Sequence, residues 1–195
     1  MVYGVLEKLF AGVLIILFLP LLCVLCILVR LTSRGPFLYR QERIGKDNKP
    51  FWIYKIRTMI DGADKLQAKY RKQNEADGPV FKIRNDPRYT RIGVFLSHSA
   101  LDELPQLINV LRGEMSFVGP RPLPKKEAQL VPKKYQSRFS VLPGMTSSWV
   151  VQGSHSLSFK KWMELDCAYV RHSSPMQNIT IFVQTAWVVV KEILN

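Results

Sequence analysis

The adjacent acidic residues Asp102 and Glu103 have the types and spacing best suited to chemistry on a phosphate group. They fall at the expected start of a short amphipathic helix, with Pro105 in its first turn, where a missing N–H costs least. Ser99, three residues before Asp102, resembles the first residue of a capping box. The positive end of a helix favours ionised carboxylates and binds phosphate. One carboxylate could attack phosphorus while the other holds Mg²⁺, although acidic residues in first turns also serve simply as complements to the helix dipole.

Basic residues near this acidic pair are candidates for binding phosphate oxygens. Arginine suits that role because its planar fork matches the geometry of phosphate. The alternative for most positions is a solvated basic face or contact with anionic lipid headgroups. Arg121 is the best candidate, because Pro120 and Pro122 stiffen the backbone that presents it. The candidate phosphate-binding residues are Lys55, Arg57, Arg88, Arg112 and Arg121.

The elements that must position these residues give an α+β fold that is mostly helical. Phe51–Arg57 is rich in β-forming residues and would place Lys55 and Arg57 on one face of a strand. Leucines and an isoleucine at helical spacing predict a helix that starts near Ser99 and ends by Gly113. Further helices are expected at Asp61–Asn74, which is charged and exposed, at Ser158–Tyr169, and at Asn178–Leu194, which could cap the core or lie in a bilayer interface.

The N-terminal region contains a membrane segment. Leu9–Val29 holds 21 residues without a charge, about 30 Å of helix and enough for the hydrocarbon core. Pro20, in the middle of this run, predicts a kink. A kinked span and a re-entrant hairpin both fit. Lys8 before the segment and Arg30 and Arg34 after it give no inside–outside bias, which mildly favours the hairpin.

The composition is basic, with 28 Lys and Arg against 15 Asp and Glu and a formal net charge of +13. This charge predicts an anionic partner, which could be nucleic acid, an acidic membrane surface or a phosphorylated substrate. A nucleic-acid binder is disfavoured, because no recognised motif is present and the aromatic residues do not interleave with basic ones. Cys23 and Cys26 lie inside the apolar run and are interpreted as small hydrophobic residues.

Several longer stretches occur in a characteristic order along the chain. They are Tyr54–Met59, Asn85–Arg88, Leu101–Gln106, Asn109–Ser116, Val118–Pro122, Pro143–Thr146, Leu165–Asp166 and Tyr169–Val170. Taken together, these stretches make the sequence resemble the monotopic phosphoglycosyl transferases, also called bacterial sugar transferases. The resemblance extends from the apolar N-terminal segment to the final helix.

The resemblance implies a two-step reaction. Asp102 would attack the sugar-proximal phosphate of a UDP-sugar, so that UMP leaves and a phosphosugar stays on the enzyme as an acyl phosphate. A polyprenol (undecaprenyl) phosphate would then take up the phosphosugar. Glu103, with Asp102 beside it, would bind Mg²⁺, which neutralises charge developing on the diphosphate. Such a reaction is the first membrane step in assembling an exopolysaccharide, an O-antigen or a glycoprotein glycan.

The resemblance also implies an architecture and a location. Residues 1–34 would form a re-entrant helix-break-helix hairpin broken near Pro20, and residues 35–195 a small cytosolic domain with amphipathic interfacial helices at its C-terminal end. The protein would be monotopic, on the cytoplasmic face of the bacterial inner membrane. Its expected partners are the UDP-sugar, the polyprenol phosphate and anionic lipids, without nucleic acid, and a homodimer is left open.

The sequence departs from the family pattern at several positions. Ser97 and His98 stand where relatives usually carry a basic pair, and Ser147, Val150 and Ser154 replace a Gly, a Gln and an Arg. The arginine is a phosphate-contact candidate in relatives. The alternative interpretation is therefore a catalytically weak or inactive relative that acts as a membrane-bound scaffold or a nucleotide-sugar sensor.

Overall fold

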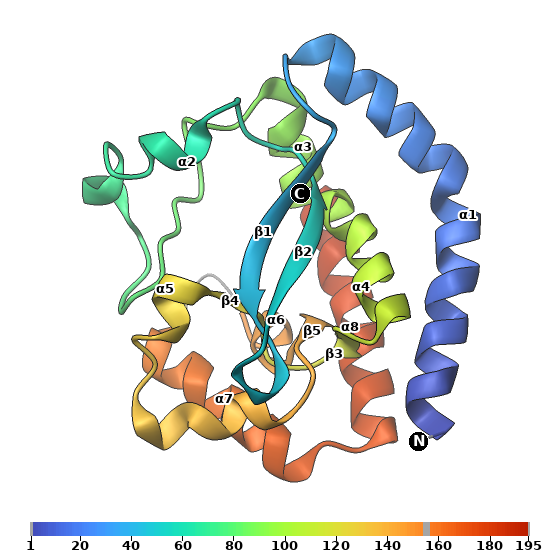
Figure 1. Ribbon diagram of the computed structural model, residues 1–195, viewed down its shortest axis with the longest axis vertical. Coiled ribbons are helices and arrows are strands. Elements are labelled where there is room, and N and C mark those ends of the chain that lie inside the picture. The colour runs from blue at the N-terminus through green and yellow to red at the C-terminus, as the bar shows by residue number, and fades with distance from the viewer. Residues whose placement is uncertain (1, 154–156, 195) are drawn as a thin grey trace.

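The computed structural model describes residues 2–153 and 157–194 and has a mixed α and β fold that is mostly helical, as expected. Figure 1 shows a long two-stranded hairpin and a still longer N-terminal helix, with a short helix between them. The helices are α1 (Val2–Thr32), α2 (Ala63–Leu66), α3 (Arg91–His98), α4 (Leu107–Arg112), α5 (Lys125–Ala128), α6 (Ser148–Val151), α7 (Phe159–His172) and α8 (Pro175–Leu194), with 3₁₀ turns η1 (Lys46–Asn48), η2 (Arg71–Gln73), η3 (Leu101–Gln106) and η4 (Lys133–Ser140). The strands are β1 (Leu38–Ile44), β2 (Pro50–Ile56), β3 (Ser116–Val118), β4 (Leu123–Pro124) and β5 (Gly144–Thr146).

The N-terminal helix α1 is long and apolar enough to enter a membrane, with a mean hydropathy of 3.2 in its most apolar window. It continues through Pro20, and Figure 1 shows it bent partway along its length. The expected break near Pro20 is therefore not confirmed. A proline removes one backbone hydrogen bond and crowds the preceding turn, which bends a helix without ending it.

Both ends of α1 are fastened to the rest of the chain. Near its start, Glu7 Oε1 accepts hydrogen bonds from the Ser116 hydroxyl (2.5 Å) and from Phe117 N–H (3.2 Å). After its end, the Arg57 guanidinium donates to the carbonyls of Ser33 (2.9 Å), Arg34 and Pro36 (2.7 Å). Charged side chains thus anchor the two termini of an otherwise apolar helix.

The strands form two small sheets. β1 and β2 pair antiparallel from Leu38↔Ile56 to Ile44↔Pro50, and the short β4 joins the other edge of β1 at Ile44↔Leu123. β3 and β5 form a separate parallel pair. The predicted strand Phe51–Arg57 is confirmed by β2, which begins and ends one residue earlier. β1 was not predicted, because its charged and polar residues hide the alternation of a half-buried strand.

The predicted helix from Ser99 to Gly113 is confirmed, but its first half is 3₁₀. η3 runs directly into α4, which ends at Gly113 in the left-handed conformation (φ 76°) that favours glycine. The predicted capping box is wrong. The Ser99 hydroxyl donates to Phe95 O (2.7 Å) and so closes the preceding helix, and Ala100 begins η3 with φ 54°.

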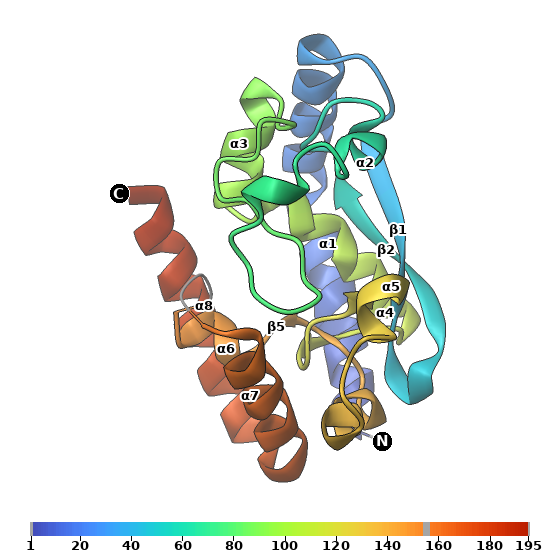
Figure 2. The same cartoon turned by 90° about the vertical axis from the view of Figure 1, so that its left-hand side faces the viewer.

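The C-terminal helices match the predictions more closely than the region before α3. Ser158 caps α7, and its side chain accepts from Lys161 N–H, while α8 begins three residues before the predicted Asn178. The charged helix predicted over Asp61–Asn74 is wrong, since this segment contains only two short turns of helix. Figure 2 shows α7 and α8 together on one side of the molecule and the β1–β2 hairpin on the other.

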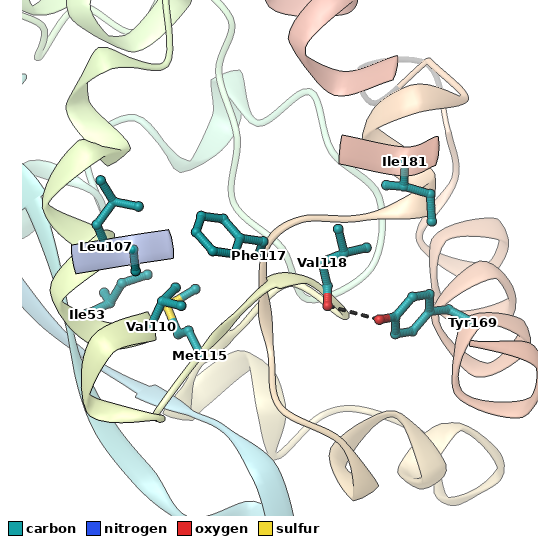
Figure 3. Close-up of a cluster of buried hydrophobic side chains, with 9 residues drawn as sticks. Ile53, Leu107, Val110, Met115, Phe117, Val118, Tyr169 and Ile181 are labelled. Carbon is teal, nitrogen blue, oxygen red and sulfur yellow. Dashed lines mark hydrogen bonds between the residues drawn. The ribbon is translucent and has the colours of Figure 1, made fainter. Parts of the chain in front are cut away.

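The main apolar core joins these layers. Ile53 from β2, Leu107 and Val110 from α4, and Phe117 from β3 pack in one buried cluster with residues of α1, α7 and α8. Figure 3 shows Tyr169 of α7 reaching this cluster, where its hydroxyl donates to a carbonyl of β3 at 2.9 Å. Burying apolar surface stabilises the fold, and here it also holds η3 and α4 against β2.

Candidate active site

The acidic pair shares one lysine at the interface of β2 and η3. Lys55 Nζ lies 2.6 Å from Glu103 Oε1 and 3.3 Å from Asp102 Oδ2. The Asp102 side chain is 7% exposed, against 22% for Glu103 and 18% for Lys55, so Asp102 is the most deeply buried of the three. The structure thus brings together one cation and two carboxylates from segments that are far apart in the sequence.

Burial and charge separate the acidities of the two carboxyl groups. Burial raises the pKa of Asp102 to about 6; the Glu103 charge adds to that effect, while Lys55 and Arg121 oppose it. Burial would also raise the pKa of Glu103, but Lys55 and Arg121 outweigh burial and hold that pKa below its ordinary value. Burial opposes the charge of Lys55, and the two carboxylates nevertheless raise its pKa. At neutral pH both carboxylates are therefore predominantly ionised.

A buried asparagine fastens the helix that follows the acidic pair to the lysine's strand. Asn109 is fully buried in α4; its Nδ2 donates to Trp52 O (2.7 Å), and its Oδ1 accepts from Tyr54 N–H at 3.3 Å. Both backbone groups lie on β2, within the three residues before Lys55. The asparagine therefore sets the position of η3 and α4 along the strand.

A small cleft opens beside Glu103 and Lys55. Two donors at its wall, Gln106 Nε2 and Arg43 Nε, are buried and have no hydrogen-bond partner among the residues that the structure describes. A buried donor without an acceptor costs about 1–3 kcal/mol, so a ligand rich in acceptor oxygens would complement this wall. The cleft is lined by Arg43, Ile53, Lys55, Glu103, Gln106, Arg121, Pro122, Gly144 and Met145.

Gln106 and Arg43 are site residues that the sequence analysis missed. Gln106 closes the Leu101–Gln106 stretch that carries the family resemblance, and this position was the one available signal. Arg43 lies on β1, the strand whose pattern did not identify it. Because Arg43 also donates to Pro122 O at 3.0 Å, it connects β1 to the segment that presents Arg121.

Arg121, the favoured phosphate-binding candidate, reaches the cleft. It lines the cleft with Lys55 and Glu103, and its charge acts on both carboxylates of the acidic pair. Its guanidinium carbon lies 5.9 Å from the centre of the Trp149 ring, a distance typical of a cation–π contact.

The other three arginine candidates do not line this cleft. Arg57 anchors the end of α1, as described above. Arg88 is 6% exposed and forms an ion pair with Asp86, its Nη2 lying 2.5 Å from Asp86 Oδ2. Arg112 donates to the Tyr54 hydroxyl at 2.9 Å at an exposed position. Arg57 and Arg88 therefore have their guanidinium donors engaged by the protein itself.

The positions that depart from the family pattern differ in their burial and in their contacts. Ser97 shares a hydrogen bond of 3.0 Å with the Tyr89 hydroxyl, and His98 is exposed at the end of α3. Ser147 is buried and Val150 half-buried beside Trp149. Ser154 lies outside the described residues.

The fold and the cleft define a small α and β domain joined to a long apolar helix, with a basic site built around two carboxylates. The chain belongs to the bacterial sugar transferase family, which it matches over residues 1–192.

Three relatives illustrate this membership. The chain is 39% identical to the UDP-galactose-lipid carrier transferase of Erwinia amylovora over 181 residues, which is 91% of this chain and 38% of the relative. It is 34% identical to the exopolysaccharide production protein ExoY of Rhizobium meliloti (strain 1021) over 183 residues, 92% of this chain and 81% of the relative. It is 36% identical to the UDP-glucose:undecaprenyl-phosphate glucose-1-phosphate transferase of Escherichia coli (strain K12) over 187 residues, 91% of this chain and 38% of the relative. The chain thus spans less than two fifths of the length of the first and third of these relatives.

Proposed function

We propose that this protein transfers a sugar-1-phosphate from a UDP-sugar to undecaprenyl phosphate and releases UMP. The family match and the names of the relatives from Erwinia amylovora and Escherichia coli support the reaction class. The observation that carries the proposal is the cluster of Asp102, Glu103 and Lys55. Glu103 and Lys55 line the cleft together with Arg43 and Arg121, and Asp102 lies next to this lining through its ion pair with Lys55. In a bacterium this would be the first membrane step of exopolysaccharide, O-antigen or glycoprotein assembly.

The proposed chemistry has two displacements at one phosphorus atom. A carboxylate oxygen of Asp102 attacks the sugar-proximal phosphorus, a P–O bond forms, and the bond to the bridging oxygen breaks so that UMP leaves with the electron pair. An oxygen of undecaprenyl phosphate then attacks the same phosphorus. The acyl-phosphate bond breaks, the Asp102 carboxylate is regenerated, and the phosphosugar passes to the lipid.

The cationic wall of the cleft suits the charge that this reaction carries. Lys55 and Arg121 would neutralise the diphosphate and the UMP leaving group, and preorganised charges of this kind are the main source of catalysis in phosphoryl transfer. Gln106 and Arg43 would donate their unpartnered N–H groups to phosphate oxygens. Lys55 would release Asp102 as the diphosphate takes its place beside the ammonium group.

We also propose Mg²⁺ as the cofactor, held by Glu103 and Asp102. Magnesium in phosphate enzymes is typically bound by one or two carboxylates together with substrate oxygens and water. The two adjacent carboxylates fit this pattern, and among the described residues no cluster of three or more His, Cys, Asp or Glu offers a site made by the protein alone. Bound there, Mg²⁺ would supply charge neutralisation for the diphosphate.

The proposed location is the cytoplasmic face of the inner membrane, in a monotopic topology. α1 is about 46 Å long at 1.5 Å per residue, and polar bonds fasten both its ends to one domain. Both ends of a helix held in this way would lie on the same side of the bilayer, which supports a monotopic topology more than crossing of the bilayer. Exposed apolar residues on α8, including Ile179, Val183 and Trp187, support an interfacial position for that helix.

The decisive experiment combines transfer assays with detection of the covalent adduct. Detergent-solubilised protein is incubated with undecaprenyl phosphate, Mg²⁺ and a panel of UDP-glucose, UDP-galactose and UDP-N-acetylgalactosamine, and UMP release is measured. Wild-type protein should release UMP with at least one donor. Without the acceptor, mass spectrometry should find a phosphosugar on Asp102.

Asp102→Asn should abolish both UMP release and the adduct, because an amide cannot serve as the nucleophile, whereas the exposed Asp61→Asn should keep both. An active Asp102→Asn protein would contradict the nucleophile assignment. No UMP release by the wild type with any donor would instead favour the scaffold or sensor alternative.

A further inference from the structure

The backbone of the segment that presents Arg121 is held by two other arginines. Arg138 Nη2 donates to Arg121 O at 2.7 Å, and Arg43 Nη1 donates to the next carbonyl, that of Pro122, at 3.0 Å. Pro120 and Pro122 on either side of Arg121 have no N–H to donate. The fold therefore holds this segment mainly through hydrogen bonds to its carbonyl groups.

Arg138 is itself fixed by a buried carboxylate. Its Nε and Nη2 lie 3.1 and 2.8 Å from Asp166 Oδ2, and the two side chains are 1% and 2% exposed. Arg138 comes from η4 and Asp166 from α7, and Phe139, Tyr135 and Met163 from the same elements belong to the apolar cluster around them. The same Nη2 atom bonds both Asp166 and the Arg121 carbonyl, so the pair and the segment form one connected unit.

The ion pair lies outside the cleft. Neither Arg138 nor Asp166 lines the cleft, and the hydrogen bonds of both side chains are made within the protein. A buried ion pair contributes little net stability compared with apolar packing, because both charges must be desolvated. The two buried charges lie where Nη2 of Arg138 also bonds the Arg121 carbonyl.

We infer that Arg138 and Asp166 are a positioning pair, which sets the place of the Arg121 guanidinium in the cleft by holding the Arg121 carbonyl. This inference rests on the proposed function, in which Arg121 binds the diphosphate of the UDP-sugar. A misplacement of about 1 Å in a group that orients a substrate can cost about a hundredfold in rate. Loss of the pair should accordingly weaken use of the donor through Arg121 alone.

The test is a double-mutant cycle with Asp166→Asn and Arg121→Ala, measuring kcat and KM for UDP-glucose, or for whichever donor of the panel the wild type uses. Asp166→Asn alone should lower kcat/KM by about ten- to a hundredfold, with a raised KM. In the Arg121→Ala background it should cost less than about twofold, because the residue through which it acts is already gone. Asp86→Asn is the matched control, since Asp86 is also a buried carboxylate paired with an arginine, and its effect should be the same factor in both backgrounds.

Equal losses from Asp166→Asn in the two backgrounds would overturn the inference and leave the pair a purely structural role. If Asp166→Asn does not fold, Arg138→Lys replaces it in the cycle, because lysine keeps the charge opposite Asp166 but lacks the fork that reaches both partners. The dissociation constant of the same donor, measured by calorimetry without acceptor, should follow the same non-additive pattern. A wild-type protein that neither binds nor turns over any donor would overturn the proposed function itself, whereas an active wild type with additive losses would overturn the positioning pair alone.

Discussion

Asp102 and Glu103 differ in environment although they are neighbours in the sequence. Lys55 Nζ lies closer to Glu103 than to Asp102, and Asp102 is the more buried. The pKa of Glu103 is consequently lowered, whereas that of Asp102 is raised to about 6. Pairs of carboxyl groups whose environments push their pKa values apart commonly divide the roles in an active site. Here the lowered pKa of Glu103 keeps it charged, which suits a ligand of Mg²⁺. The raised pKa of Asp102 still leaves it ionised at neutral pH, which suits a nucleophile.

This difference predicts the pH dependence of the proposed reaction. Asp102 must lose its proton to act as a nucleophile, so kcat/KM for the UDP-sugar should be level above about pH 6 and fall about tenfold per pH unit below it. A bound divalent cation favours the carboxylate and lowers its pKa, so raising the Mg²⁺ concentration should move this acid limb to lower pH. Removal of Mg²⁺ with a chelator should abolish transfer.

Variants of Lys55 test whether its positive charge lowers the pKa of Asp102. Lys55→Met removes a positive charge that lowers the pKa of Asp102, so any residual activity should show an acid limb at higher pH. Lys55→Arg keeps the charge and should leave the limb near that of the wild type. An acid limb near pH 4 in the wild type, unaffected by Mg²⁺, would contradict a buried nucleophile at residue 102.

At the scale of elements, the site depends on how η3 and α4 lie along β2. The edge of β2 that faces away from β1 has backbone groups that β1 does not pair, and Asn109 bonds two of them. The same amide donates to Glu114 Oε2 at 2.7 Å, which ties down the loop after α4. One fully buried side chain thus serves a strand, a helix and a loop.

Asn109→Leu should therefore destabilise the fold by about 2–4 kcal/mol, because it removes the side-chain partner of the part-buried Tyr54 N–H and Trp52 C=O and of the Glu114 carboxylate. Chemical denaturation in detergent would measure the change in the free energy of unfolding. Asn85→Leu is the control at an exposed position and should change this free energy by less than about 0.5 kcal/mol. A loss of that small size for Asn109→Leu would show that other contacts align α4 with β2.

Some of these elements could be predicted from the sequence and others could not. Strong local patterns predicted β2, the helix around Leu101–Arg112, and α7, and they brought Lys55, Asp102 and Glu103 into consideration. β3 and β5 are three-residue strands that pair in parallel although their partners, such as Ser116 and Gly144, lie 28 positions apart in the sequence. No local periodicity predicts such a pairing.

Arginine roles were the least predictable feature of the candidate site. Arg57 and Arg88 were candidates alongside the favoured Arg121, because the residue type does not show which acceptor lies near it. The structure gives Arg57 four carbonyl acceptors after the end of α1 and gives Arg88 the carboxylate of Asp86. Of the four arginines predicted to bind phosphate, Arg121, held between two prolines, is the one that lines the cleft. Backbone stiffness was therefore a better indicator than charge.

At the scale of the whole molecule, the apolar surface and the polar anchors of α1 act together. Figures 1 and 2 show α1 running along the body of the protein, and its exposed residues, such as Ile16 and Leu17, face outward. Its first turns bond β3 and α8 through Glu7 and Tyr3, and its last turn is followed by the carbonyls that Arg57 binds. The proposed monotopic topology would place both ends of α1 on the side of the bilayer where this domain lies.

This topology predicts which positions of α1 a membrane-impermeant thiol reagent can reach. With Cys23, Cys26 and Cys167 replaced, single cysteines at Gly4 and at Arg34 should both be labelled in inside-out membrane vesicles and both be protected in intact spheroplasts. Gly4 has open space around it and Arg34 is exposed, so neither change should disturb packing. A cysteine at Ile16, exposed on the apolar face, is the control and should resist labelling from both sides, because hydrocarbon excludes the reagent. Labelling of Gly4→Cys from one side and of Arg34→Cys from the other would mean that α1 crosses the bilayer, and the bonds of Glu7 and Arg57 could then not both exist in the membrane.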